Sequence, residues 1–379
     1  MIFTPLTLQL LVDIVKAERE VPASLAEVFD QFTDLALGRL DISRGIESVF
    51  VYIVKKTFLA ELAWAEFGQK ERLRIPREDF DAFVEKYMGI YSWDRDKFEQ
   101  FISEIERAGI LRIGDELVFF RHRSFLDYFM ALRVSEHREE IHDLDNEIVN
   151  LYFNDFWTDV AFFYIGIRRR ITQAIVDGIS NYCGEAFETE ILKVLIGRLL
   201  QAGWNTPTEI KKQAIRVGVT NFEPIHSHLV KLLESQEKRV PLIMADLFVL
   251  ALSQYSFFSR TLSREGLTVA NELLEEKTSD ALMKSLALFC ANRSIVDTAD
   301  AREYVVKALD TSAQLEQERK LSIHDKYVSL FLLQQIEHED KKLLKSTRRK
   351  LVRVRLQYPT GISHLLPVPK TGFRKKKKS

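Results

Sequence analysis

One stretch, residues 110–132, most constrains what this chain can fold into; it reads ILRIGDELVFFRHRSFLDYFMAL. Its first half predicts a β-hairpin, because the β-rich runs Ile110–Ile113 and Glu116–Arg121 flank Gly114-Asp115, a turn pair that tolerates positive φ. Its second half predicts a helix. The chain must therefore join a small sheet directly to a helix.

That helix has a recognisable start and one buried face. Ser124 is the expected N-cap, and Asp127, three residues later, is the acidic variant of a capping box. Apolar side chains then recur at i, i+3, i+4 and i+7, which predicts a buried stripe made of Phe125, Tyr128, Phe129 and Leu132.

Three basic or titratable residues, Arg121, His122 and Arg123, precede the helix directly. Helix N-termini attract anions, because the free backbone N–H groups and the helix dipole point the same way. We therefore predict an anion-binding site at this junction. The alternative is that His122 only caps or packs there, which is common for a histidine between a strand and a helix.

The string FFRHRSFLDYFMA resembles the F-x-H-x-S-F-x-E-Y-F-x-A segment that closes the winged-helix domain of NACHT-type STAND nucleotide-binding proteins. In that family the histidine contacts the β-phosphate of bound ADP and helps to hold the resting state, which implies the same role for His122. Asp127 stands where the family usually has Glu. The segment Thr4-Pro5-Leu6 is similar, more loosely, to the family segment whose proline contacts adenine, which implies that role for Pro5.

The resemblance implies a helical subdomain over residues 1–70 and a winged-helix domain over residues 71–138, with a small two-stranded wing. Beyond it, helices separated by short polar breaks predict a solenoid-like array of α-helical hairpins over residues 139–356. Residues 357–379 predict a basic flexible tail. The expected fold class is mainly α, a winged helix followed by this array.

The sequence contains no motif for nucleotide hydrolysis. None of its 15 glycines begins G-x-x-x-x-G-K-[ST], the loop that wraps phosphates with backbone amides and a lysine. We therefore expect no enzyme activity and no cofactor in this chain alone. The resemblance implies that it is a fragment or the product of a split gene, and that ADP or ATP binds when an upstream NTPase domain joins it, in the same or a separate chain.

Composition excludes several other classes of protein. The two cysteines, Cys183 and Cys290, give neither a disulfide framework nor a zinc set, and no signal peptide or transmembrane segment is expected, so a cytoplasmic protein is the simplest interpretation. The pair His226-x-His228 lacks further ligands for a metal site.

The net charge of −1 hides an asymmetry along the chain. Residues 341–379 hold 14 Lys and Arg and no Asp or Glu, whereas the remainder holds 40 Lys and Arg against 55 Asp and Glu. This excess predicts an anionic partner, such as nucleic acid, an anionic membrane surface or the chain's own acidic body. The residues expected to bind it are Lys341, Arg348, Arg349, Lys350, Lys375, Lys376, Lys377 and Lys378. The alternative is a solvated helix with a solubilising tail.

Three functions fit the sequence. The first is the regulatory and sensor portion of a STAND signalling NTPase, with a winged helix that stabilises the ADP-bound resting state and an array that recognises a protein or nucleic-acid ligand; the family implies antiviral defence. The second is nucleic-acid binding by the winged helix and basic tail, although the expected recognition helix, Asp94–Ala108, is acidic. The third is a helical scaffold for protein–protein interaction.

Overall fold

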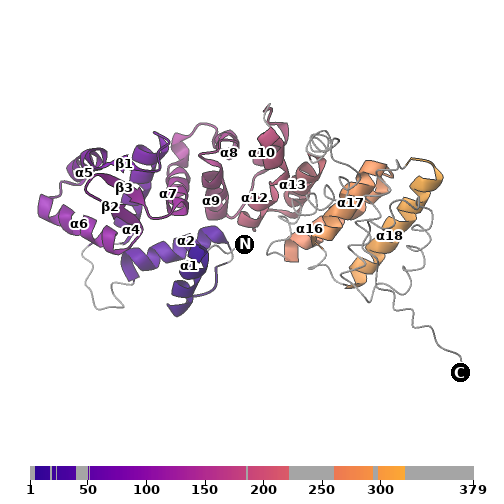
Figure 1. The fold of residues 1–379 in the computed structure, drawn as a ribbon, viewed down its shortest axis with the longest axis horizontal. Coiled ribbons are helices and arrows are strands. Elements are labelled where there is room, and N and C mark those ends of the chain that lie inside the picture. Colours follow the sequence, from indigo (N-terminus) through magenta and orange to yellow (C-terminus); the bar gives the residue numbers. More distant parts are fainter. Residues whose placement is uncertain are drawn as a thin grey trace, which may run out of the picture. The chain divides into compact units, whose positions relative to one another are not determined.

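A computed structural model describes residues 5–17, 19–22, 24–39, 50, 52–184, 187–221, 260–292 and 298–320. The described residues are mainly helical with one small antiparallel sheet, which confirms the mainly α class (Figure 1). The winged helix and the solenoid-like array stay predictions. Contacts divide the chain into two compact units: Met1–Cys183 with Arg198–Pro207, and Gly184–Gly197 with Thr208–Ser379. The domain limits drawn from the sequence stay a prediction.

The first unit contains the sheet and most of the described helices. Its helical elements are α1 (Pro5–Lys16), α2 (Leu25–Asp34), the π-helical η1 (Leu35–Arg39), α4 (Tyr52–Leu62), the π-helical η2 (Ala63–Gly68), α5 (Arg77–Tyr91), α6 (Arg95–Arg107), α7 (Arg123–Glu136), the 3-10 turn η3 (Arg138–Glu140), α8 (Leu144–Tyr152), α9 (Thr158–Arg168), α10 (Gln173–Asn181) and all but the first residue of α12 (Gly197–Ala202). Pro5 lies in the first turn of α1, where the backbone N–H that proline lacks would make no hydrogen bond within the helix.

The second unit contains α11 (Phe187–Val194), α13 (Thr208–Thr220), α16 (Arg260–Glu275), α17 (Ser279–Asn292) and α18 (Thr298–Gln317). Within the predicted array, apolar spacing predicts helices over residues 190–202, 209–218, 267–275, 280–291 and 299–309. The first is interrupted between α11 and α12, and the other four are confirmed. The same spacing also predicts helices over residues 226–234, 242–258, 323–337 and 340–356, which, like the basic tail, lie outside the described residues.

The sheet has three strands, β1 (Ile75–Pro76), β2 (Leu111–Ile113) and β3 (Leu117–Phe120), in the order β1-β3-β2 with both pairs antiparallel. The predicted hairpin of β2 and β3 is confirmed, but the expectation of only two strands was wrong. Ile75 and Pro76 do not open helix α5. They pair with β3 instead. The Arg77 N–H donates to the Glu116 carbonyl over 2.8 Å, and helix α5 begins at Arg77.

The hairpin turn also differs from the expectation. Ile113 pairs with Val118, so the connection has four residues, and the Gly114 N–H donates to the Leu117 carbonyl over 3.0 Å. Gly114 does not adopt positive φ; Gly109, just after α6, does, with φ 71°. A connection of this length is commonly built on a type I turn, which needs no positive φ.

Helix α7 lies at the centre of the first unit, where it packs against α4, η2 and α9 (Figure 1). The predicted stripe is buried, and so are the residues between its members, so α7 is enclosed from Phe125 to Leu132. Phe29 of α2 joins this core through edge contacts with Phe125 and Phe163, each with ring centroids 5.1 Å apart. By contrast Ile53 of α4, which apolar spacing over residues 45–67 predicts to be buried, is 47% exposed.

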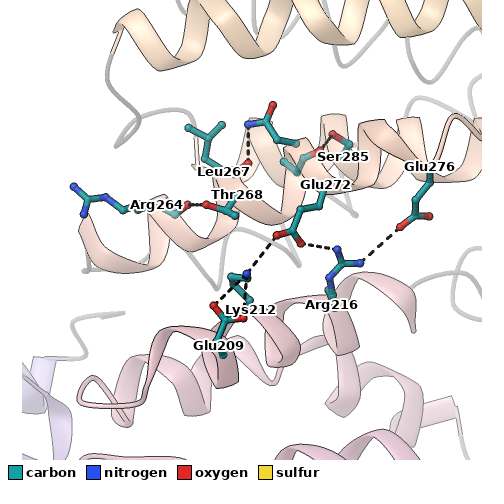
Figure 2. Close-up of polar contacts among 11 residues, drawn as sticks. Glu209, Lys212, Arg216, Arg264, Leu267, Thr268, Glu272, Glu276 and Ser285 are labelled. Carbon is teal, nitrogen blue, oxygen red and sulfur yellow. Dashed lines mark hydrogen bonds and ion pairs between the residues drawn. The ribbon is translucent and has the colours of Figure 1, made fainter.

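In the second unit a row of charges joins α13 to α16, as Figure 2 shows. Glu272 accepts a hydrogen bond from Arg216 (2.5 Å) and forms an ion pair with Lys212 (3.3 Å), while Arg216 also lies 3.7 Å from Glu276. Burial opposes ionisation of Glu272, but these cations lower its pKa below the usual value. Ion pairs and a hydrogen bond between charged side chains therefore join α13 to α16.

Candidate functional site: the strand-to-helix junction at His122

A two-residue junction, Arg121 and His122, connects β3 to α7. The Arg121 N–H donates to the Ile110 carbonyl over 2.9 Å, which extends the hairpin to the start of the helix. His122 has an extended backbone and is the N-cap: its Nδ1 accepts a hydrogen bond from the Ser124 N–H over 3.1 Å. The assignment of Ser124 as N-cap was wrong, because the imidazole already supplies the acceptor that the first turn needs.

The cap determines which ring nitrogen of His122 faces a ligand. Since Nδ1 accepts a hydrogen bond, the neutral ring carries its proton on Nε2. His122 is exposed, and within the described part of the chain no side chain pairs with Nε2. The junction therefore presents a ring N–H donor to solvent at a helix N-terminus, an arrangement that suits a phosphate or carboxylate.

Arg123 is held by three contacts with the protein. Its Nε donates to Asp127 Oδ1 over 2.6 Å, its Nη2 donates to the Phe156 carbonyl, and its guanidinium lies 4.1 Å from the centroid of the Phe156 ring. We call Arg123, Asp127 and Phe156 the arginine clamp. The guanidinium charge of Arg123 is thus partly offset by Asp127. A role for Arg123 in anion binding stays a prediction.

Asp127 does not cap the helix as expected but is buried, with 1% of its side chain exposed. Burial raises the pKa of Asp127 to about 7, although the charge of Arg123 acts to lower it; the carboxylate of Asp159 on α9 adds to the rise. A carboxyl group that changes charge near neutral pH therefore lies one turn inside the helix that His122 caps.

The other predicted site residues lie apart from this junction or outside the described residues. A Cβ built on Gly109 would lie 3.4 Å from Arg121 Nη1, so the Arg121 side chain reaches the C-terminal end of α6. Pro5 is exposed at the start of α1, which packs on α2, and α2 packs on α7 and α9. The eight basic residues between Lys341 and Lys378 are outside the described part, so their roles stay predictions.

A polar network beneath α7 was not anticipated from the sequence. The Tyr128 hydroxyl donates to Asp30 Oδ1 over 2.7 Å, and Lys56 Nζ lies 2.5 Å from the same oxygen. Burial acts to raise the pKa of Asp30, but the charge and hydrogen bond of Lys56 hold it below the usual value. Burial, together with Asp30, raises the pKa of Tyr128 well above its ordinary value.

A second buried ion pair was also missed. Lys55 Nζ lies 2.8 Å from Glu104 Oε2 and donates to the Leu37 carbonyl over 2.6 Å, and both charged side chains are almost fully buried. One signal was available: Glu104 follows Phe101 by three residues, so it falls on the buried face of α6. Nothing in the sequence indicated its partner.

The described residues contain no group of three or more His, Cys, Asp or Glu placed to hold a metal ion. No helix among them is long and apolar enough to cross a membrane.

Comparison with known proteins points to a family for the segment that contains the junction. Residues 73–130 match the family model described as Novel STAND NTPase 4. The match runs from just before β1 into α7, so it includes the whole sheet, α5, α6 and His122. It associates this segment with STAND-type NTPases and covers 58 of the 379 residues. No curated protein and no solved structure matches the chain.

Proposed function

We propose that this chain is the regulatory and sensor portion of a STAND-type signalling NTPase. The match of residues 73–130 to a STAND family model carries the proposal, together with the exposed ring donor of His122 inside that segment. In this proposal the sheet with its helices is a winged-helix domain of NACHT type that stabilises the ADP-bound resting state. The helices after residue 138 form a hairpin array that recognises a protein or nucleic-acid partner, with antiviral defence as the implied biology.

The proposed chemistry at the junction is recognition of a phosphate. The Nε2–H of His122 donates to a β-phosphate oxygen of ADP, and the N-terminal end of α7 adds its positive dipole. A hydrogen bond to a charged oxygen contributes about 1.5–3 kcal/mol. The rest of the nucleotide is bound by the P-loop of an upstream NTPase domain, with Pro5 against the adenine. The chain alone hydrolyses no ATP.

The charges of α6 favour this proposal over duplex DNA binding by a winged helix. Arg95 lies 3.4 Å from Glu99, and Lys97 lies 3.9 Å from Asp94, so these cations are paired within the helix itself. A surface already neutralised by its own carboxylates gives little attraction for phosphates.

The test begins with the genomic sequence upstream: a P-loop in frame or in a neighbouring gene supplies the NTPase domain. ADP affinity of the assembled proteins is then measured by calorimetry for His122→Asn, which keeps a capping acceptor but lacks the outward ring N–H. We expect ADP binding to weaken by roughly ten- to a hundredfold.

The matched control is His142→Asn, an exposed histidine outside the matched segment, for which no change in affinity is expected. Unchanged ADP affinity in His122→Asn, or an upstream region without any P-loop, would overturn the proposal.

A further inference from the structure

The arginine clamp connects the first turn of α7 to the segment between α8 and α9. The planar guanidinium of Arg123 donates from Nε to Asp127 and from Nη2 to the Phe156 carbonyl, and it also lies over the Phe156 ring. A lysine could not make these contacts together, since it is a point charge without a fork. Arg123 therefore ties two segments that are 33 residues apart.

The far end of the clamp is itself anchored. The Phe156 N–H donates to Asn154 Oδ1 over 2.9 Å, and the neighbouring Trp157 donates from Nε1 to Glu71 over 3.2 Å. The Trp157 ring also meets that of Trp64 in η2, with centroids 5.5 Å apart. The segment that receives Arg123 is thus attached to residues just before the sheet, so the guanidinium has a fixed target.

The near end of the clamp is the peptide that follows His122. Arg123 is the first residue of α7, and the next N–H, that of Ser124, donates to the imidazole. Because the Asp127 side chain is only 1% exposed, losing Arg123 would leave a buried carboxyl group without the hydrogen bond that Arg123 donates to it. The position of Arg123, and with it the donor that orients the imidazole, is therefore strongly determined.

A second pair in the same unit shows what is particular to the clamp. Arg77, the first residue of α5, donates from Nε to Asp81 Oδ1 over 2.7 Å, with the same spacing of four residues. The Asp81 side chain is 51% exposed, against 1% for Asp127. The two pairs share their geometry and differ in burial, so Arg77–Asp81 is a matched control.

We propose that Asp127, acting through Arg123, is a positioning residue that fixes the His122 ring donor and couples its state to the segment 153–157. Its role toward ADP rests on the proposed function above, whereas its role in orienting the ring does not. A ligand bound at Nε2 then stabilises the observed position of Arg123. Conversely, displacement of Phe156 lowers the affinity for that ligand.

The first test observes the imidazole directly in the full chain. Nitrogen NMR of ¹⁵N-histidine protein, with His122 assigned by His122→Asn, should show the Nε2–H tautomer in the wild type. In Asp127→Leu we expect averaged tautomers at His122 and faster amide exchange over residues 153–157. Asp81→Leu should change neither. A wild-type His122 signal in Asp127→Leu would overturn the proposal.

Arg123→Lys covers the case in which Asp127→Leu does not fold. Lysine keeps the charge beside Asp127 but cannot also reach the Phe156 carbonyl. We expect the same loss of a single tautomer and the same faster exchange, and unchanged signals would again overturn the proposal.

The last arm uses the NTPase assembly. Asp127→Leu should weaken ADP binding about tenfold. Combining it with His122→Asn should weaken binding little more than His122→Asn alone, because both substitutions act through the same ring donor. If His122→Asn leaves ADP affinity unchanged, the proposed function fails while the ring measurement still decides the positioning role. Full additivity of the two substitutions would count against coupling through His122.

Discussion

The Tyr128 hydroxyl donates a hydrogen bond to Asp30 across 2.7 Å, joining α7 to α2 although the two residues are 98 positions apart. Lys56 of α4 contacts the same carboxylate, so three helices meet at one oxygen atom. This contact places a charge-assisted hydrogen bond directly under the helix that His122 caps.

Tyr128→Phe should lower the free energy of unfolding by about 1.5 kcal/mol, because it removes the hydrogen bond of a fully buried hydroxyl to a charged acceptor whose side chain is half exposed. Urea denaturation followed by circular dichroism measures the change. Tyr52→Phe, at a side chain that is 40% exposed, is the control and should change stability little. An equal effect of both substitutions would show that the Tyr128–Asp30 bond adds no stability.

Removing one partner of the Lys55–Glu104 pair should be more damaging than removing both. Lys55→Met leaves the Glu104 carboxylate buried without its cation, and we expect a loss of about 3–5 kcal/mol. Lys55→Met combined with Glu104→Leu should recover much of it. The double-mutant cycle is measured by chemical denaturation, and additive losses would contradict a direct charge interaction.

The stability of the chain should depend on the charge of Asp127 between about pH 4 and pH 7. Burial raises the folded-state pKa to about 7, above the value of 3.8 for an exposed carboxyl. In that window the folded protein keeps a proton that the unfolded chain has lost. Stability is therefore full below about pH 4 and falls as pH rises through 7, by up to about 4 kcal/mol.

Asp127→Asn cannot ionise, so its unfolding free energy should lack this fall. The measurement is a series of denaturation curves across pH, read as the difference between variant and wild type. Asp81→Asn, from the exposed pair, should follow the wild type. Parallel curves for Asp127→Asn and wild type would refute the assignment.

Glu272→Gln should weaken the contact between α13 and α16 by about 1 kcal/mol or less, since one third of its side chain is exposed to solvent and salt screens the network. The loss should be larger at low ionic strength and shrink in 0.5 M NaCl. Thermal unfolding at both salt concentrations measures it. A loss that does not depend on salt would indicate packing and not charge.

The sequence predicted those features that depend on local periodicity. The apolar stripe of α7, its preceding hairpin and the helices of the described chain follow from spacing, which tertiary contacts reinforce. The start of α7 was misjudged, because Ser124 and Asp127 match a capping pattern in spacing. The pattern could not show that Asp127 points inward to Arg123 while an imidazole takes the capping place.

The two ion pairs of the buried lysines could not be predicted from the sequence alone. Lys55 and Lys56 are adjacent lysines, which normally indicate an exposed helix face. Each is buried because a carboxylate from another helix meets it: Glu104 for Lys55 and Asp30 for Lys56. Such pairing depends on how the helices pack against each other, and it cannot be predicted from the spacing of residues along one helix.

Pro76 has a consequence for how the molecule meets its neighbours. It lies on β1, an outer strand of the sheet, and proline has no backbone N–H to offer to a further strand. Open strand edges invite pairing with other chains. On the β1 side the sheet therefore carries its own protection against growth into aggregates, and substituting Pro76 with valine would expose a pairing edge within the segment that matches the STAND family.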